Sequence, residues 1–138
     1  IIGQARDVFR NTQDVEIYIL NNTNTEVVVL GDKDQVLRTF NNLFKNAIEA
    51  ADVNTVCIIK VNISNNQERV FIEVEDNGKG IDASLQDKIF VPNFTTKSSG
   101  TGLGLAFVKQ AVENAGGTVE FKSFGEVGTT FYLTFPLS

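Results

Sequence analysis

Residues 32–51 read DKDQVLRTFNNLFKNAIEAA, and this stretch predicts one long amphipathic helix around which the fold is organised. Its apolar side chains recur at three- and four-residue spacing, which places them on one arc of a helix at 100° per residue. They are Val36, Leu37, Phe40, Leu43, Phe44, Ala47, Ile48 and Ala51. Asp32, with Gln35 three positions later, has the spacing of a capping box, so the helix is expected to begin there.

Segments with strand patterns precede and follow this helix in the sequence. Alternating apolar residues and β-branched runs predict strands over residues 15–19, 27–30, 55–63, 69–75, 119–121 and 131–135. Further helices are predicted over residues 1–10 and 103–115, the latter stopped by Gly116-Gly117. The order β-β-α-β-β-loop-α-β-β indicates a single domain in which helices cover one face of a mixed sheet.

Composition excludes several classes of function. The 138 residues are 42% hydrophobic and 21% charged, which is typical of one globular domain, and the net charge of −5 argues against a nucleic-acid partner. No histidine is present, so imidazole general bases and histidine-bound zinc are excluded. The single cysteine, Cys57, has apolar neighbours and is expected in the core. No apolar run is long enough to span a bilayer, and Ile1 opens the chain without a Met or a signal segment, so we expect a soluble fragment without membrane contact.

Polar residues also line one side of the long helix. Asn42, Asn46 and Glu49 are spaced i, i+4 and i+7, so they project along one line away from the apolar arc. Asparagine is a poor helix former, and such a row costs helix stability without local gain. From these residues alone, a solvated face and a functional face both remain open.

Two glycine-rich segments could approach a ligand. Residues 76–80, DNGKG, follow a predicted strand and suit either an ordinary turn or a pocket floor with Asp76 as an acceptor. Residues 100–105, GTGLGL, directly precede a predicted helix, where free N–H groups could hold phosphate. A simple glycine hinge is the weaker alternative for this segment. No P-loop motif occurs, and the loose dinucleotide fingerprint at residues 78–83 lacks its ribose-binding acid. The loop-rich stretch between the two segments is too long for a plain connection and indicates a functional or mobile region.

Taken in order, these segments resemble the GHKL, or Bergerat-fold, ATPases, and most closely the catalytic ATP-binding domain (HATPase_c) of sensor histidine kinases. The segments that carry the resemblance are residues 42–47 (N box), 76–80 (G1 box), 89–97 (F box), 100–105 (G2 box) and 128–131 near the C-terminus. The resemblance implies an α+β two-layer sandwich, with a mixed, mainly antiparallel five-stranded sheet and about three helices on one face. It also implies a single domain over residues 1–138, with a flexible ATP lid at about residues 82–101.

The resemblance implies ATP and Mg²⁺ as ligands and assigns roles to individual residues. Asp76 would accept a hydrogen bond from the adenine amino group, supported by Thr129 through water, and the Asn46 oxygen would bind Mg²⁺. Lys97 would hold the phosphates, so the catalytic set is Asn42, Asn46 and Lys97. The full nucleotide-binding set implied is Asn42, Asn46, Ala50, Asp76, Gly78, Gly80, Ile81, Phe90, Phe94, Thr96, Lys97, Gly100, Thr101, Gly102, Leu103, Gly104, Leu105 and Thr129.

Asn42 favours phosphoryl transfer over hydrolysis. The hydrolases of this superfamily resemble one another in carrying a glutamate four residues before the metal-binding asparagine, and an amide cannot act as a general base. The chain also lacks the phospho-acceptor histidine, so the resemblance implies half of an enzyme whose partners are an upstream histidine hairpin, a response regulator reached through it, and a second copy in a homodimer. The expected location is the cytoplasm, within a full-length protein that could be anchored in the inner membrane. The alternative is a non-kinase GHKL ATPase or a nucleotide-sensing module.

Overall fold

The computed structural model describes residues 2, 15–23, 33–51, 55–91, 104–123 and 128–137. Within them the chain forms one five-stranded sheet in the order β1-β2-β3-β5-β4. The strands are β1 (Val15–Asn21), β2 (Cys57–Asn65), β3 (Arg69–Asp76), β4 (Thr118–Ser123) and β5 (Thr129–Pro136). β1 and β2 are parallel and every other neighbouring pair is antiparallel, so the prediction of a mixed, mainly antiparallel sheet is confirmed.

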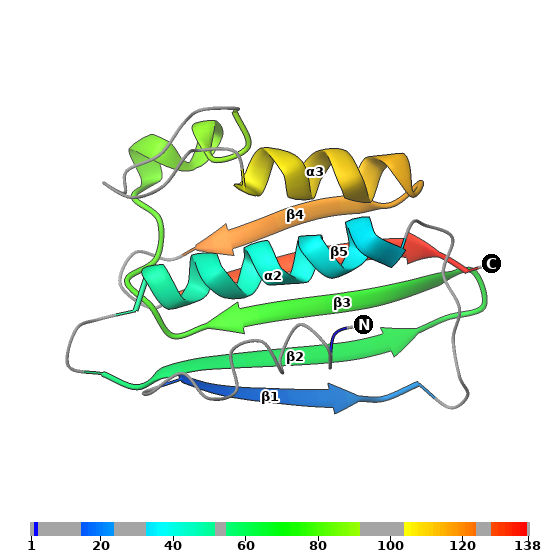
Figure 1. Cartoon of the computed structure of the whole chain (residues 1–138), viewed down its shortest axis with the longest axis horizontal. Helices are drawn as coiled ribbons and strands as arrows, with labels where there is room; N and C mark the ends of the chain where they lie inside the picture. The colour runs from blue at the N-terminus through cyan, green and yellow to red at the C-terminus, as the bar shows by residue number, and fades with distance from the viewer. Residues whose placement is uncertain are drawn as a thin grey trace.

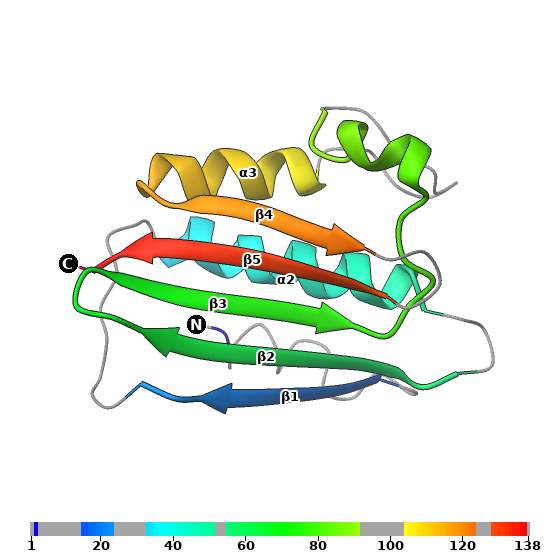
Figure 2. The ribbon, with the colours of Figure 1, turned by 180° about the vertical axis from the view of Figure 1, so that it is seen from behind.

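Helices cover one face of this sheet. Figure 1 shows α2 (Lys33–Glu49) and α3 (Gly104–Asn114) side by side over the strands, and the reverse view in Figure 2 shows the sheet in front of both. The 3₁₀-helix η1 (Ala83–Lys88) lies beyond the N-terminal end of α3 and is the one short helix in the described part of the long loop. The predicted helix over residues 1–10, the predicted strand at 27–30 and the Asp32 cap fall on residues that are not described, apart from Ile2.

The core lies between the sheet and the two helices. On α2, the apolar arc faces this layer as predicted: Phe40, Leu43 and Phe44 are at most 2% exposed. Leu37 and Ile48, at the margin of the arc, are partly buried against the core. Alternate residues of each central strand face this layer, for example Phe131 and Leu133 on β5. Each fully buried Leu or Phe side chain contributes about 1.5–3 kcal/mol, so this layer is the main source of stability.

The first strand of the β2–β3 hairpin is shifted by two residues from its sequence pattern. The pattern starts this strand at Thr55, whereas β2 starts at Cys57. At the turn, the pattern ends the strand at Ile63, whereas β2 continues to Asn65. The Asn66 side chain explains the difference, because its Oδ1 accepts hydrogen bonds from the N–H groups of Glu68 and Arg69, both at 2.8 Å. This Asx turn completes the reversal in fewer residues and leaves Asn65 in the ladder.

Glycine ends α3 as predicted. Gly116 has a φ of 83°, and the Gly117 N–H donates to the Val112 carbonyl at 2.9 Å. A Cβ at Gly117 would overlap the Thr134 carbonyl oxygen of β5, so glycine is required by conformation at position 116 and by contact at position 117. The chain therefore turns directly from α3 into the edge strand β4.

Candidate functional site

The last residue of β3 and the first residue of β5 lie together at one end of the sheet. Glu75 pairs with Thr130 in the antiparallel register, so Asp76 and Thr129 are neighbours. Asp76 Oδ1 accepts hydrogen bonds from the Gly78 N–H at 2.9 Å and the Thr129 N–H at 3.3 Å. Asp76 is 7% exposed and Thr129 5% exposed. A buried carboxylate is thus held in one orientation by two backbone donors.

A glycine brings the end of α2 against the loop that follows β3. The Lys79 N–H donates to the Ala50 carbonyl at 3.0 Å, and a Cβ at Gly78 would lie 2.6 Å from the same oxygen. Only glycine allows this approach without a shift of the backbone. The predicted ligand residues Ala50, Asp76 and Gly78 are therefore brought together in the fold.

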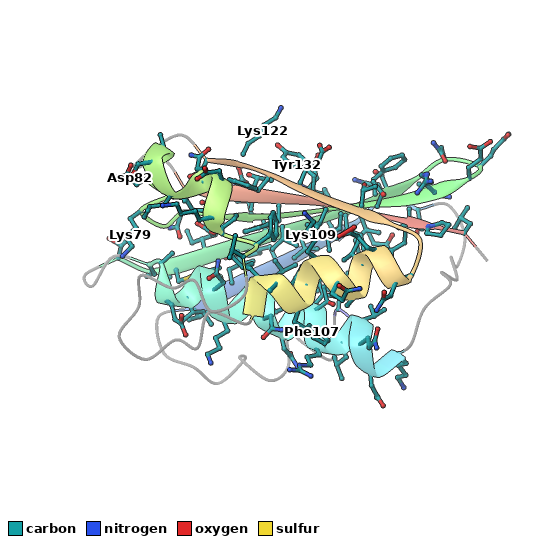
Figure 3. The ribbon with its side chains drawn as sticks, turned by 90° about the horizontal axis from the view of Figure 1, so that it is seen from above. Lys79, Asp82, Phe107, Lys109, Lys122 and Tyr132 are labelled. Carbon is teal, nitrogen blue, oxygen red and sulfur yellow. The ribbon has the colours of Figure 1, made fainter. Side chains whose placement is uncertain are left out.

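The next residues of this loop turn towards β4. Gly80 has a φ of 76°, which favours glycine, and the Ile81 N–H donates to Ser123 Oγ at 2.7 Å. Figure 3 shows Lys79 and Asp82 at the same end of the molecule. The Asn77 side chain faces the other way and bonds to β2 and its entry, accepting from the Ile58 N–H and donating to the Val56 carbonyl. The DNGKG segment thus combines the predicted ligand loop with a side chain, Asn77, that ties this loop to β2.

Helix η1 begins at a capping carboxylate and is tied to β4. Asp82 Oδ1 accepts from the Ser84 N–H at 3.0 Å and from its hydroxyl at 2.9 Å, which lowers the pKa of Asp82. Gln86 Nε2 donates to two carbonyls, those of Ile81 at 3.1 Å and Ser123 at 3.3 Å. The start of the predicted lid is therefore attached to the same strand end as the loop after β3.

The polar side of α2 faces the beginning of α3. Asn42, Asn46 and Glu49 are each half-buried, which does not fit a fully solvated face. A Cβ at Gly104, the first residue of α3, would lie 3.7 Å from Asn42 Oδ1. The predicted N-box helix and the last glycine of the predicted G2 box are thus adjacent, although 62 positions separate Asn42 from Gly104 in the sequence.

Phe90 packs against the sheet at the far end of η1. Its ring meets Phe121 at 5.9 Å and Phe131 at 6.4 Å between centroids, both edge to face. The Lys109 ammonium lies 5.6 Å from the centre of the Phe90 ring. Aromatic and cation–π contacts stabilise a fold beyond the burial of apolar area, so Phe90 fixes the start of the F-box segment on the core.

The remaining predicted site residues divide into two groups. Leu105 is half-buried and packs on the core, as does Ile81. Seven predicted ligand residues fall outside the described part of the chain, namely Phe94, Thr96, Lys97, Gly100, Thr101, Gly102 and Leu103. Their roles therefore stay predictions.

Sequence reasoning missed Ser123 as a site residue. Its hydroxyl bonds to Ile81, Gly128 and Thr129, and its carbonyl to Gln86, so it joins the loop after β3, the entry to β5 and η1. A single serine at a strand end carries no motif. The one signal was its position five residues before the Gly128-Thr129 pair.

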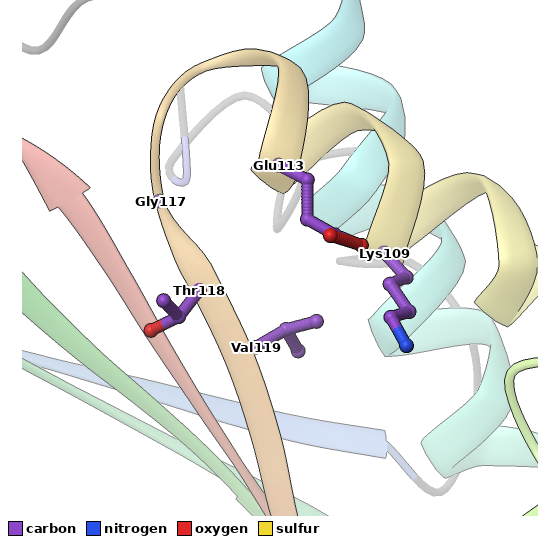
Figure 4. A pocket seen from close by; sticks show the side chains of 5 residues that line it. All are labelled: Lys109, Glu113, Gly117, Thr118 and Val119. Atoms are coloured by element: carbon purple, nitrogen blue, oxygen red, sulfur yellow. The ribbon is translucent and has the colours of Figure 1, made fainter.

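One cavity of about 140 Å³ lies elsewhere, between α3 and β4. Figure 4 shows its lining residues, which are Lys109, Glu113, Gly117, Thr118 and Val119. Pockets for organic ligands usually measure roughly 300 to 1,000 Å³, so this cavity is too small for a nucleotide. It shares no residue with the site around Asp76.

Comparison with known proteins identifies the family of this chain. Residues 31–138 match the family model HATPase_c, described as the histidine kinase-, DNA gyrase B- and HSP90-like ATPase family. The chain is 40% identical over 129 residues to the sensor histidine kinase ZraS of Escherichia coli K12, and the matched region covers 93% of this chain and 27% of that protein. It is 39% identical over 111 residues to sporulation kinase A of Bacillus subtilis, covering 80% of this chain and 18% of that protein. The chain thus spans about a quarter or less of these relatives.

Solved structures show the same fold. The catalytic domain of the histidine kinase ThkA superposes with a TM-score of 0.83 at 29% identity, covering 98% of this chain and 89% of that one. The mycobacterial sensor histidine kinase MprB superposes with a TM-score of 0.84 at 25% identity, covering 99% and 91%. The chain therefore belongs to the histidine kinase-, DNA gyrase B- and HSP90-like ATPase family, as an ATPase domain of the sensor histidine kinase type.

Proposed function

We propose that this domain binds Mg-ATP at the end of β3 and presents the γ-phosphoryl group to a histidine on a separate helical hairpin. The observation that carries the proposal is the buried Asp76 carboxylate, oriented by the N–H groups of Gly78 and Thr129. A fixed acceptor of this kind recognises a ligand amino group and rejects a ligand oxygen at the same place. The amino group of adenine fits that requirement, and Thr129 supports the contact through water.

The half-buried polar side of α2 would supply the metal contact. Asn46 offers one neutral amide oxygen, and the described residues contain no group of three or more acidic, histidine or cysteine side chains suited to a metal. Such a donor set fits Mg²⁺, which usually binds through few protein oxygens and completes its shell with phosphates and water. When bound, Mg²⁺ would neutralise charge on the phosphates. Asn46 would orient that ion, and Asn42 would lie beside the phosphates near Gly104.

The segments around the phosphates complete the proposed site. Lys97 would contact the terminal phosphate, and the backbone at the start of α3 would bind the others. Phe90 and Phe94 would hold the lid, residues 82–101, against the core. The rest of the proposed set is Ala50, Gly80, Ile81, Thr96, Gly100, Thr101, Gly102, Leu103 and Leu105.

Asn42 supports transfer rather than hydrolysis. An uncharged amide cannot remove a proton from water at neutral pH, so no base at this position activates a water molecule. The chain has no histidine of its own to label. Phosphoryl transfer depends mainly on positioning and charge neutralisation, and a hairpin that brings its own nucleophile would complete the reaction.

Radiolabelled ATP tests this function. We expect no label on the domain alone or on its cognate hairpin alone, and acid-labile, base-stable phosphohistidine on the hairpin in the mixture. A hairpin with its histidine replaced by glutamine is the matched control and should stay unlabelled. Rapid phosphate release by the domain alone would instead identify a hydrolase of the same fold, and absence of ATP binding would leave only a partner-binding module.

The proposal extends to the longer protein. A response regulator would take the phosphoryl group from the hairpin, and the hairpin would join two copies into a homodimer. The domain would work in the cytoplasm, whether or not the whole protein is held at the inner membrane. Among the described helices, none has the length and apolarity needed to cross a bilayer.

A further inference from the structure

The Ser123 hydroxyl makes hydrogen bonds with three different groups. It accepts from the Ile81 N–H at 2.7 Å and donates to the Gly128 carbonyl at 3.2 Å. The Thr129 hydroxyl lies 3.2 Å away as its third partner. Gly128 reaches this position with a φ of 108°, and a Cβ there would overlap the Asp76 carbonyl oxygen. Three segments of the chain therefore meet at one oxygen.

These partners determine which way each hydroxyl points. A backbone N–H can only donate and a carbonyl can only accept, so the one Ser123 hydrogen is directed at Gly128. Ser123 Oγ must then accept from Thr129, and the Thr129 hydrogen is directed at Ser123. Towards any other group, Thr129 Oγ1 presents lone pairs alone.

Thr129 and Asp76 together form a surface that accepts hydrogen bonds and donates none through their side chains. Both are buried side by side, and the Thr129 N–H is already directed at Asp76 Oδ1. We propose that Ser123 is a positioning residue that determines base specificity, because it keeps Thr129 as an acceptor and so favours a 6-aminopurine over a 6-oxopurine nucleotide. The inference rests on the proposed function, since it concerns the base end of the same site.

The chemistry differs between the two bases. A 6-amino group donates to Asp76, and a water molecule that donates to both N1 and Thr129 Oγ1 completes the contact. A 6-oxopurine instead presents an oxygen to these acceptors. Without the Ser123 oxygen, the Thr129 hydroxyl could rotate and donate towards that oxygen, so discrimination should fall.

Calorimetric titration with Mg-ATP and Mg-ITP tests the inference, because the two bases differ only at N1 and position 6. In Ser123→Ala the ratio of the two Kd values should shrink about fivefold, the equivalent of one net hydrogen bond of ~1 kcal/mol. Ser123→Thr, which restores the hydroxyl, should restore the ratio. Ser64→Ala, at an exposed serine of β2, is the matched control and should leave it unchanged.

A second pair of variants separates specificity from stability. Thr129→Val should shrink the ratio as well, and adding Ser123→Ala to it should change the ratio no further. If Ser123→Ala does not fold, Ser123→Cys takes its place in the test, because the thiol has nearly the same shape but is only a weak hydrogen-bond donor and acceptor. Equal weakening of both nucleotides by the Ser123 variant would overturn the inference and leave the proposed function intact. Equal binding of both by the unmodified domain would overturn the inference together with the assignment of Asp76 to the adenine amino group. Failure of the unmodified domain to bind ATP would overturn both the inference and the proposed function.

Discussion

At the scale of single residues, Asp76 is positioned by backbone donors that an asparagine could also satisfy. In Asp76→Asn the amide oxygen would accept from Gly78 and Thr129, which directs its NH₂ group towards the bound base. A donor then faces the adenine amino group, so ATP affinity should fall roughly tenfold to a hundredfold. Calorimetry measures the loss, and an unchanged Tm shows that the fold is intact. Full affinity in a folded variant would refute the role of Asp76.

Asn46 is tested through the metal. Asn46→Ala should abolish the difference between ATP titrations with Mg²⁺ and with a chelator, because the variant lacks the proposed oxygen ligand. Asn41→Ala, on the same helix, removes an amide whose Oδ1 is buried without a hydrogen-bond partner, so it should keep the Mg²⁺ dependence. A persistent Mg²⁺ effect in Asn46→Ala would reassign the metal ligand.

At the scale of elements, the contact of α2 with the loop after β3 depends on Gly78. In Gly78→Ala the new methyl group would press on the Ala50 carbonyl that accepts the hydrogen bond of the Lys79 N–H. The free energy of unfolding should therefore fall by about 1–3 kcal/mol. Urea denaturation measures this change. Gly104→Ala is the control, because its Cβ would meet Asn42 at an ordinary 3.7 Å and the variant should lose no stability. Equal stability of the Gly78 variant would contradict the close contact.

The proposed lid is an element whose behaviour can be measured directly. Phe90 is packed on Phe121 and Phe131, so residues 83–91 have a described attachment to the core. We expect amide hydrogen exchange over residues 87–100 to slow when a non-hydrolysable ATP analogue is added with Mg²⁺. Peptides from β2 serve as the internal reference. Equal protection with and without nucleotide would count against a lid.

At the scale of the whole molecule, Cys57 reports on unfolding. It is the single cysteine, 2% exposed, with its Sγ 3.7 Å from the Ala47 carbonyl, and burial together with Asp76 raises the pKa of its thiol. Alkylation at pH 8 should therefore be slow in the folded domain and fast in urea. Saturating Mg-ATP, at a hundred times its Kd, should slow alkylation up to about a hundredfold, because binding stabilises the folded state. Fast alkylation of the folded domain would contradict the described core.

Local patterns predicted what depends on local physics. The periodicity of α2, the hairpin of β2 and β3 and the stop at Gly116 all follow from spacing and backbone preference, and the structure confirms them. The parallel pairing of β1 with β2 joins segments 42 positions apart, and no local pattern encodes it. Ser123 could not be predicted as a site residue for the same reason, since its contact with Ile81 also spans 42 positions and exists only in the folded chain. The family resemblance, rather than periodicity, supplied the nucleotide-binding roles.

The Gln86 amide has a consequence for the way η1 can separate from β4. A single nitrogen donates to Ile81 and to Ser123, carbonyls that belong to different segments. Withdrawing that side chain breaks both hydrogen bonds in one event, so a state with only one of the two bonds broken should be little populated. Detachment should therefore be all-or-none, and relaxation-dispersion signals from residues 81, 86 and 123 should fit one shared exchange rate. The rate of nucleotide exchange would then be set by this single detachment of η1 from β4.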